Sequence, residues 1–453
     1  MKKLIVLLLA LALPGVLFAQ TKQPRKVFPY TYTFDDLPNG LRLITVPTDY
    51  PNLVSLYIVV QTGSRNEIEP GKTGYAHFFE HLMFRGSEHF SADQRDAILK
   101  RAGADSNAYT SDDRTVYHEV FSKEDLPQIM ELEADRFKNL KYERNPYKTE
   151  ALAVKGEYNK NSANPTSKLF EVLRETAYKS HTYAHTTMGY IKDIEDFPNQ
   201  YEYSLEFFKR YYRPEYSTIV VVGDVTQAQA LALTKKYWSD WQKGNYVPQI
   251  PKEAEQTEPR TAHVDWPSPT LPWVVVGFRG PAYSDTSKDK AALDLLAAIA
   301  FGENSDLYQR LVIKEQKATD DFGPDFENKV DPELFTVWSA VKKQEDMDYV
   351  RDQILATYKR YTTELIPKAM LAQTSSRLRY SYALRMNSSE AIAGSLAPYI
   401  SLRRSPQTID KLYALYESIT PEDVRAAASR YFVEKNRTIV TLATKSDSKG
   451  GTK

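Results

Sequence analysis

The most constraining feature of this chain is a pattern that occurs once in each half. Phe208-Lys209-Arg210-Tyr211-Tyr212 precedes the strand-like run 217–222, and Ser429-Arg430-Tyr431-Phe432 precedes the run 437–442. Both runs continue as Thr-Ile-Val, and both follow an expected helix that ends in aromatic residues. Repetition at long spacing indicates a duplicated structural unit. With 453 residues, too many for one ordinary core, we expect an α+β fold of two homologous domains. Each is expected to be an antiparallel-rich mixed sheet packed with helices.

A linker separates the two expected domains. Residues 243–260 hold three prolines among charged side chains, a composition typical of linkers. Beyond them, the runs 273–277 and 285–301 repeat the strand-then-helix order of the first half. We therefore expect an N-terminal domain at 20–242 and a C-terminal domain at 261–453.

The N-terminus has the residue order of a secretory signal peptide, expected at 1–19. Two lysines precede an apolar run from Leu4 to Phe18, and the small residue Ala19 follows. Pro14-Gly15 interrupts the run, which is also short for a membrane span. We expect cleavage after Ala19 and export, in a bacterium to the periplasm; an uncleaved membrane anchor is the alternative.

Composition narrows the chemistry. Lys plus Arg and Asp plus Glu both number 59, so no net field favours nucleic acid, and we expect no nucleic-acid partner. The absence of cysteine excludes disulfides, thiolate zinc sites and a cysteine nucleophile. The seven histidines therefore become the main candidates for metal chemistry.

Two of these histidines form the pattern H-x-x-E-H between Gly74 and Gly86. His77 and His81 are four residues apart, so on a helix their side chains lie one above the other, with Glu80 beside them. Two imidazoles with an adjacent carboxylate suit a Zn²⁺ ion and a base that acts on its water. The alternative is a helix whose histidines only fill space, because so short a pattern also occurs by chance.

A third ligand is available on a later helix. Glu150 and Glu157 are seven residues apart in the expected helix 147–158, so they share one face two turns apart. A carboxylate is a common third ligand beside two histidines. Taken alone, either glutamate could equally belong to a solvated helix face.

The chain resembles the pitrilysin/insulinase family of zinc metallopeptidases, the inverzincins. The resemblance rests on three features: two similar α+β halves, a signal peptide, and an H-x-x-E-H pattern that occurs in the first half alone. The size is most similar to the branch that contains mitochondrial processing peptidase and small bacterial relatives, and the resemblance covers nearly the whole mature chain. It implies that His77, His81 and Glu157 bind one Zn²⁺ per chain. It also implies that Glu80 is the general base and Glu150 an accessory acid.

The resemblance extends to the segment Asn107-Ala108-x-Thr110-x-x-Asp113-x-Thr115-x-Tyr117. In the family this segment lies beside the site as an edge strand. The resemblance therefore implies that unfolded peptides align against Asn107, Ala108 and Thr110. Such binding through the backbone gives affinity without much sequence preference.

The second half departs from the family pattern. Active relatives carry an Arg and a Tyr seven residues apart, which hold the substrate carbonyl and stabilise the oxyanion. Aligned on Lys314-Glu315-Gln316, this pair falls on Val312 and Thr319, neither of which can do that; Arg310 is a displaced candidate without a matching Tyr. We therefore expect the zinc-bearing subunit of a heterodimer whose homologous partner supplies the pair. If the alignment has drifted, a homodimer is expected instead.

Two other functions are compatible with the same fold. The chain could be a non-catalytic assembly subunit, as some relatives in respiratory complexes are, or a periplasmic module that binds peptides without cleaving them. Assembly subunits of this kind usually lose the histidines or the glutamate, whereas this chain keeps His77, Glu80 and His81. A zinc endopeptidase or oligopeptidase is therefore the expected function.

Overall fold

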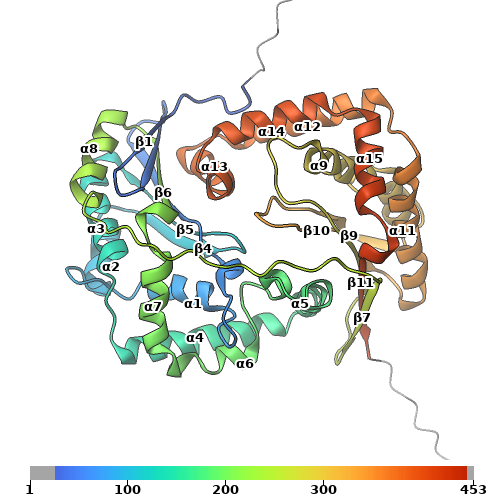
Figure 1. Ribbon diagram of the computed structural model, residues 1–453, viewed down its shortest axis with the longest axis horizontal. Helices are drawn as coiled ribbons and strands as arrows, with labels where there is room; N and C mark the ends of the chain where they lie inside the picture. The colour runs from blue at the N-terminus through green and yellow to red at the C-terminus, as the bar shows by residue number, and fades with distance from the viewer. Residues whose placement is uncertain (1–25, 446–453) are drawn as a thin grey trace, which may run out of the picture.

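The computed structural model describes residues 26–445, so the expected signal peptide lies outside the described residues. Two β-sheets dominate the molecule, one in each half of the chain (Figure 1). The first has the strand order β1-β2-β6-β3-β5-β4 and the second β7-β11-β8-β10-β9. The strands are β1 (Thr33–Asp36), β2 (Arg42–Pro47), β3 (Leu53–Val60), β4 (Asp105–Thr110), β5 (Thr115–Ser122), β6 (Ser217–Gly223), β7 (Arg260–Trp266), β8 (Trp273–Arg279), β9 (Ala318–Asp325), β10 (Leu334–Val341) and β11 (Arg437–Thr444).

The two sheets confirm the expected duplication. In the first, β6 pairs parallel with β2 and antiparallel with β3. In the second, β11 pairs parallel with β7 and antiparallel with β8. The repeated Thr-Ile-Val segments therefore occupy equivalent strands, and every other pairing is antiparallel. The hairpin β1–β2 is built on Gly40, whose φ of 90° suits glycine; the described second sheet has no counterpart of β1.

Helices cover both faces of each sheet. The long helix after Tyr142 begins at Arg144, three residues before the expected start. No helix within residues 26–445 is both long and apolar enough to cross a membrane. The α-helices are α1 (Tyr75–Leu82), α2 (Ala92–Arg101), α3 (Leu126–Lys138), α4 (Arg144–Ser162), α5 (Pro165–Ala177), α6 (Ile191–Ile194), α7 (Tyr201–Tyr211), α8 (Gln227–Trp238), α9 (Lys288–Ala300), α10 (Asp306–Tyr308), α11 (Met347–Thr363), α12 (Lys368–Arg385), α13 (Ser389–Arg403), α14 (Gln407–Ser418) and α15 (Pro421–Tyr431).

Each sheet is covered on one face by a helix from the other half of the chain. Helix α5 belongs to the first half but lies beside the second sheet (Figure 1). Its Leu169 and Leu173 are buried in one cluster with Val275 of that sheet. Conversely, α13 of the second half packs Leu396 into one core with Tyr57 of the first sheet. A sheet that buries both faces needs a layer of helices on each. Here the halves complete each other's cores.

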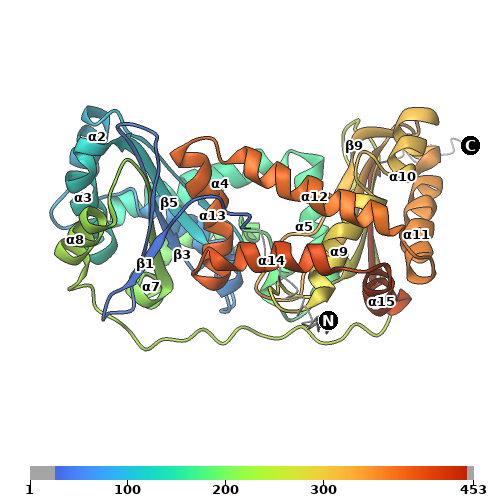
Figure 2. The ribbon, with the colours of Figure 1, turned by 90° about the horizontal axis from the view of Figure 1, so that it is seen from above.

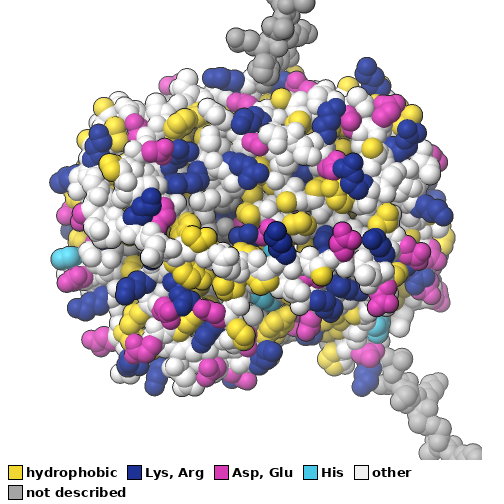
Figure 3. Space-filling view, in the orientation of Figure 1, with side chains coloured by type: hydrophobic (Ala, Val, Ile, Leu, Met, Phe, Trp, Pro, Cys, Tyr) yellow, Lys and Arg dark blue, Asp and Glu magenta, His cyan; other side chains and the backbone are white. Residues whose placement is uncertain are grey.

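The segment between the halves is extended. Residues 243–259 contain no helix or strand and run along the outside of the molecule (Figure 2). The halves also contact each other through Arg404, whose guanidinium donates to the backbone oxygens of Gly40, Glu215 and Ser217. On the face shown in Figure 3, cationic and acidic side chains are interspersed without a large area of one sign.

Candidate metal centre

Helix α1 has one face buried in the core and one less buried face, and the H-x-x-E-H pattern lies on the second. Its start is fixed by Gly74, which has φ 84°; a Cβ there would lie 2.3 Å from the Met188 carbonyl oxygen. His77, Glu80 and His81 lie on the less buried face. The opposite face packs into the core of the first half and consists of Tyr75, Ala76, Phe78, Phe79 and Leu82.

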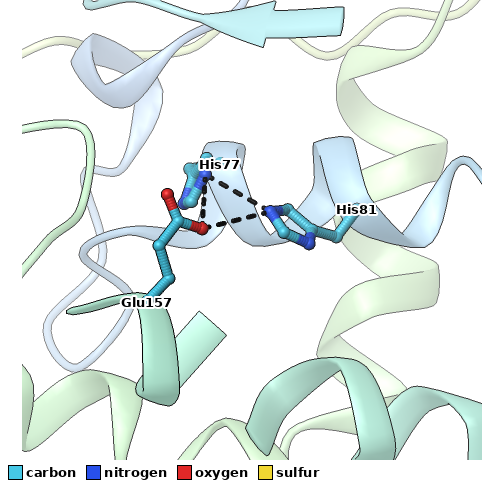
Figure 4. A group of neighbouring side chains, drawn as sticks. All are labelled: His77, His81 and Glu157. Atoms are coloured by element: carbon cyan, nitrogen blue, oxygen red, sulfur yellow. Dashed lines mark hydrogen bonds and ion pairs between the residues drawn. The ribbon is translucent and has the colours of Figure 1, made fainter. Parts of the chain in front are cut away.

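The structure brings His77, His81 and Glu157 together from α1 and α4 (Figure 4). Glu157 Oε2 lies 3.6 Å from Nε2 of each histidine, and the two Nε2 atoms are 3.4 Å apart. Ligands at about 2.1 Å from a tetrahedral zinc lie roughly 3.4 Å from one another. The three atoms therefore have the spacing, and the two imidazoles and carboxylate the chemistry, of a zinc site. Within residues 26–445, no second cluster of His, Asp or Glu meets the same criterion.

Glu150 holds one of these histidines from behind. Its Oε2 lies 3.3 Å from His81 Nδ1, and its Oε1 pairs with Arg85 Nη2 at 2.7 Å. A carboxylate on the far nitrogen of a ligating imidazole fixes the ring's orientation and tautomer. His77 has no such support, because its Nδ1 is buried without a hydrogen-bond partner among the described residues. Glu150 therefore positions His81 rather than the reacting atoms.

The two histidines differ electrostatically. Burial lowers the pKa of His77 to about 4, so that imidazole is neutral near pH 7, as a metal ligand must be. Burial also acts to lower the pKa of His81, but the hydrogen bond to Glu150 and the charge of Glu80 outweigh it and raise that pKa. Protons therefore compete with a metal ion more strongly at His81 than at His77.

Glu80 lies beside this cluster and is bonded to the outer strand of the sheet. Thr110 Oγ1 on β4 donates to Glu80 Oε2 over 2.6 Å. Burial raises the pKa of Glu80, and the bond from Thr110 opposes that rise. Thr110 was expected to contact substrate; in the structure its hydroxyl instead donates a hydrogen bond to Glu80.

The strand β4 is the outer strand expected beside the site. It pairs only with β5, so one side of its backbone has no neighbouring strand in the sheet. Asn107 is exposed, and its Oδ1 accepts the backbone N–H of Ala108 at 2.8 Å. The side chain of Asn107 thus accepts the hydrogen bond of a backbone N–H, that of Ala108, to which an added strand could otherwise bind.

Sequence patterns gave no signal for three contacts that organise the site. Glu67 precedes α1 and accepts the N–H groups of Gly74 and Ala76 at 2.6 and 2.7 Å, which holds the first turn. Arg85 neutralises Glu150, and Thr110 engages Glu80. Each pair joins segments that no periodicity relates.

The second half has no Arg/Tyr pair at the aligned positions 312 and 319. Val312 lies on a π-helical turn (Gln309–Lys314) and packs against the core of the second half. Thr319 lies on the edge strand β9. The guanidinium of Arg310 donates to Gln353 Oε1 at 2.6 Å.

Known proteins resemble the chain over most of its length. A family model described as "Insulinase (Peptidase family M16)" matches residues 43–190, and one described as "Peptidase M16 inactive domain" matches 200–378. Zinc protease PqqE of Helicobacter pylori is 28% identical over 413 residues, covering 90% of this chain and 91% of that protein. The probable mitochondrial-processing peptidase subunit beta of Schizosaccharomyces pombe is 25% identical over 420 residues, covering 88% of each. The crystal structure of a protease from Helicobacter pylori superposes with a TM-score of 0.84 at 27% identity, covering 91% of this chain and 99% of that one. Two family models in succession, these relatives and the shared fold show that the chain belongs to the insulinase/pitrilysin family of peptidases, family M16.

Proposed function

We propose that this chain is a zinc-dependent peptidase that cleaves unfolded peptides. The convergence of His77, His81 and Glu157 on one point, with Glu80 beside them, carries the proposal. The name of the Helicobacter pylori relative, a zinc protease, supports it. When bound, Zn²⁺ would acidify a water molecule and polarise the peptide carbonyl.

The role of Glu80 follows from its surroundings. As general base, its carboxylate takes the proton of the attacking water and then passes it to the leaving peptide nitrogen. A base that must also release its proton works best with a pKa closer to the operating pH than that of a solvated carboxyl. Burial raises the pKa of Glu80 in this direction, while the hydroxyl of Thr110 holds the carboxylate in place.

The substrate binds as an additional strand on β4. Its backbone pairs with the open edge at Ala108, and Asn107 rotates its side chain away from the Ala108 amide to admit it. Only an extended chain can pair in this way, because folded proteins have few free strand edges of sufficient length. The substrate class is therefore unfolded peptides of varied sequence.

A homologous partner supplies the missing oxyanion contacts. Val312 and Thr319 carry neither a cation nor a phenol, and Arg310 is bonded to Gln353. The Schizosaccharomyces pombe relative is named as one subunit of a peptidase, which supports a heterodimer; a homodimer is the alternative. Assay of the purified chain with and without a homologue that carries the Arg/Tyr pair tests this point. Full activity of the lone chain would contradict the heterodimer.

Zinc content and hydrolysis, measured on the same samples, test the catalytic assignment. Glu80→Gln keeps the shape of the side chain but removes the base, so the variant should hold one Zn²⁺ per chain and lose hydrolysis. Appreciable cleavage by this variant would refute Glu80 as the base. A non-catalytic assembly subunit would hold no zinc, and a peptide-binding module would leave a peptide pool uncut even with its partner.

We also propose that the N-terminal segment is a signal peptide that directs export of the chain and is then removed. The lysines and apolar run before Ala19 support it. Sequencing the N-terminus of the mature protein from a periplasmic extract tests it: a chain that begins at Gln20 is expected, and a chain that retains Met1 would contradict cleavage.

A further inference from the structure

A second groove lies between the N-terminal end of α5 and the second sheet, outside the metal centre. It has a volume of about 750 Å³. The rings of Trp273 and Trp338, with centroids 6.2 Å apart, line it together with Phe170. Asp321 and Asp325 of β9 also line it. We infer that this groove binds an arginine or lysine side chain of the peptide substrate, at a distance from the cleaved bond; the inference rests on the proposed function.

The indole of Trp338 is open to a ligand because of the residue opposite it. In the β9–β10 pairing, Trp338 faces Gly323, and a Cβ on that glycine would meet the ring at 4.0 Å. Any larger residue at 323 would cover part of the ring. Asp325, two residues along the strand, points to the same side as position 323. Trp338 is half-buried and lines the groove, and an accessible aromatic ring with a carboxylate beside it is the arrangement that binds a guanidinium or ammonium group.

The two carboxylates have no cationic partner of their own. Within the described chain, 26–445, no Lys, Arg or His nitrogen lies within 4.0 Å of Asp321 or Asp325. The cations that influence Asp325 most are engaged elsewhere: Lys329 with Asp112 and Glu333, and Arg174 with Asp112. Asp321 and Asp325 are both exposed, so their carboxylates are accessible to a ligand, and each lacks a counter-ion among the described residues. A cationic ligand would supply that counter-ion.

The groove lies within reach of a peptide held at the metal centre. Asn164 and Pro165 form its rim at the α4–α5 junction. Glu157 lies seven residues before Asn164 on the chain, about 10 Å along a helix at roughly 1.5 Å per residue. An extended peptide covers that distance in about three residues. The cationic side chain therefore lies several residues from the cleaved bond, where it contributes specificity that pairing with β4 alone does not give.

Chemistry favours arginine or lysine over other occupants. Their aliphatic stems pack on aromatic rings while the charged group reaches the carboxylates. An acidic side chain would be repelled, and a neutral aromatic one would leave both aspartates without a counter-ion. A stacked planar guanidinium uses both Trp338 and Asp325, so arginine should bind at least as well as lysine.

Peptide binding to the zinc-loaded Glu80→Gln protein tests the inference without requiring hydrolysis. Fluorescence anisotropy would compare unstructured peptides that carry arginine, or its neutral isostere citrulline, at successive positions. We expect one or two positions where arginine binds about tenfold tighter, and loss of that difference in the double variant Asp321→Asn, Asp325→Asn. Asp320→Asn, an exposed neighbour outside the groove, is the matched control and should retain the difference.

Each outcome bears on the inference separately from the proposed function. Equal binding of the arginine and citrulline peptides at every position, or an undiminished difference in the double variant, would overturn the subsite. Trp338→Leu gives a second readout, because it keeps the charges and removes the ring; it should weaken the arginine peptide more than the citrulline peptide. Failure of the unmodified zinc protein and its partner to cleave any peptide would contradict the proposed function instead, whatever the binding data show.

Discussion

Thr110 on the outer strand β4 donates its hydroxyl hydrogen to Glu80 on α1 over 2.6 Å. This single bond joins the expected general base to the strand on which the substrate is proposed to lie. Movement of β4 on substrate binding would therefore act directly on the base. The bond also favours the ionised carboxylate, against the effect of burial.

Thr110→Val should slow hydrolysis without loss of zinc. The substitution keeps the side-chain shape but removes the bond that lowers the pKa of Glu80, so that pKa rises further. The base form is then lost at higher pH, and the acidic limb of the kcat/KM profile should move towards neutral pH. We expect kcat to fall about tenfold to a hundredfold. Thr149→Val, on exposed α4 surface, is the control; identical pH profiles for wild type and Thr110→Val would contradict the role.

Glu150→Gln should weaken zinc binding. The amide can still contact His81 Nδ1, but it cannot stabilise the imidazole as the carboxylate does, and Arg85 loses its partner. Loss of such a supporting carboxylate typically costs about 10-fold to 100-fold in metal affinity. Competition titration with a chelator measures it. Glu143→Gln, at the exposed start of α4, should bind zinc as the wild type does, and equal affinities for all three proteins would refute the role of Glu150.

The exchange of α5 and α13 predicts that the halves unfold together. Leu173→Ala in α5 removes a buried side chain from the core of the second sheet, which should cost about 2–5 kcal/mol. Leu152→Ala, on an α4 position with 62% exposure, should cost little. The tryptophans report each half separately: Trp238 and Trp241 in the first, and Trp266, Trp273 and Trp338 in the second. Two separate transitions in urea would contradict the coupling.

Acid should weaken the contact between the halves at Asp331. Burial acts to raise the pKa of Asp331, but hydrogen bonds from His181 and Arg65 outweigh it and lower that pKa to about 2. A carboxyl whose pKa is lower in the folded than in the unfolded protein stabilises the fold, and this stabilisation is complete above the unfolded-state pKa of about 3.9. That stabilisation should disappear as pH falls from about 4 to about 2.

Urea unfolding at pH 5 and pH 3 checks this dependence. Asp331→Asn should be less stable by about 1 kcal/mol at pH 5, and the gap from wild type should narrow at pH 3. Asp320→Asn, an exposed aspartate in the same half, should not change the pH dependence. A gap that is as wide at pH 3 as at pH 5 would refute the assignment.

Local patterns predicted the elements but not their partners. The repeated Thr-Ile-Val strands followed from residues adjacent in sequence, and the structure places them in equivalent positions of the two sheets. Helical spacing likewise predicted that His77 and His81 share a face. In contrast, the pattern of α5 shows that one face is apolar but not which sheet it covers, because that choice depends on the path of the whole chain. The contacts that Glu67, Arg85 and Thr110 make in the site were missed for a similar reason, because each joins residues that meet only in the folded chain.

Zinc titration of the purified full chain tests the central claim most directly. Isothermal titration calorimetry would compare wild type, His77→Asn, Glu157→Gln and the control His263→Asn, whose histidine is exposed on β7. We predict one tightly bound Zn²⁺ per chain for wild type and the control, and affinity reduced at least about a hundredfold for the other two. Absence of a stoichiometric site in the wild type, or undiminished binding in His77→Asn and Glu157→Gln, would contradict a zinc centre at His77, His81 and Glu157.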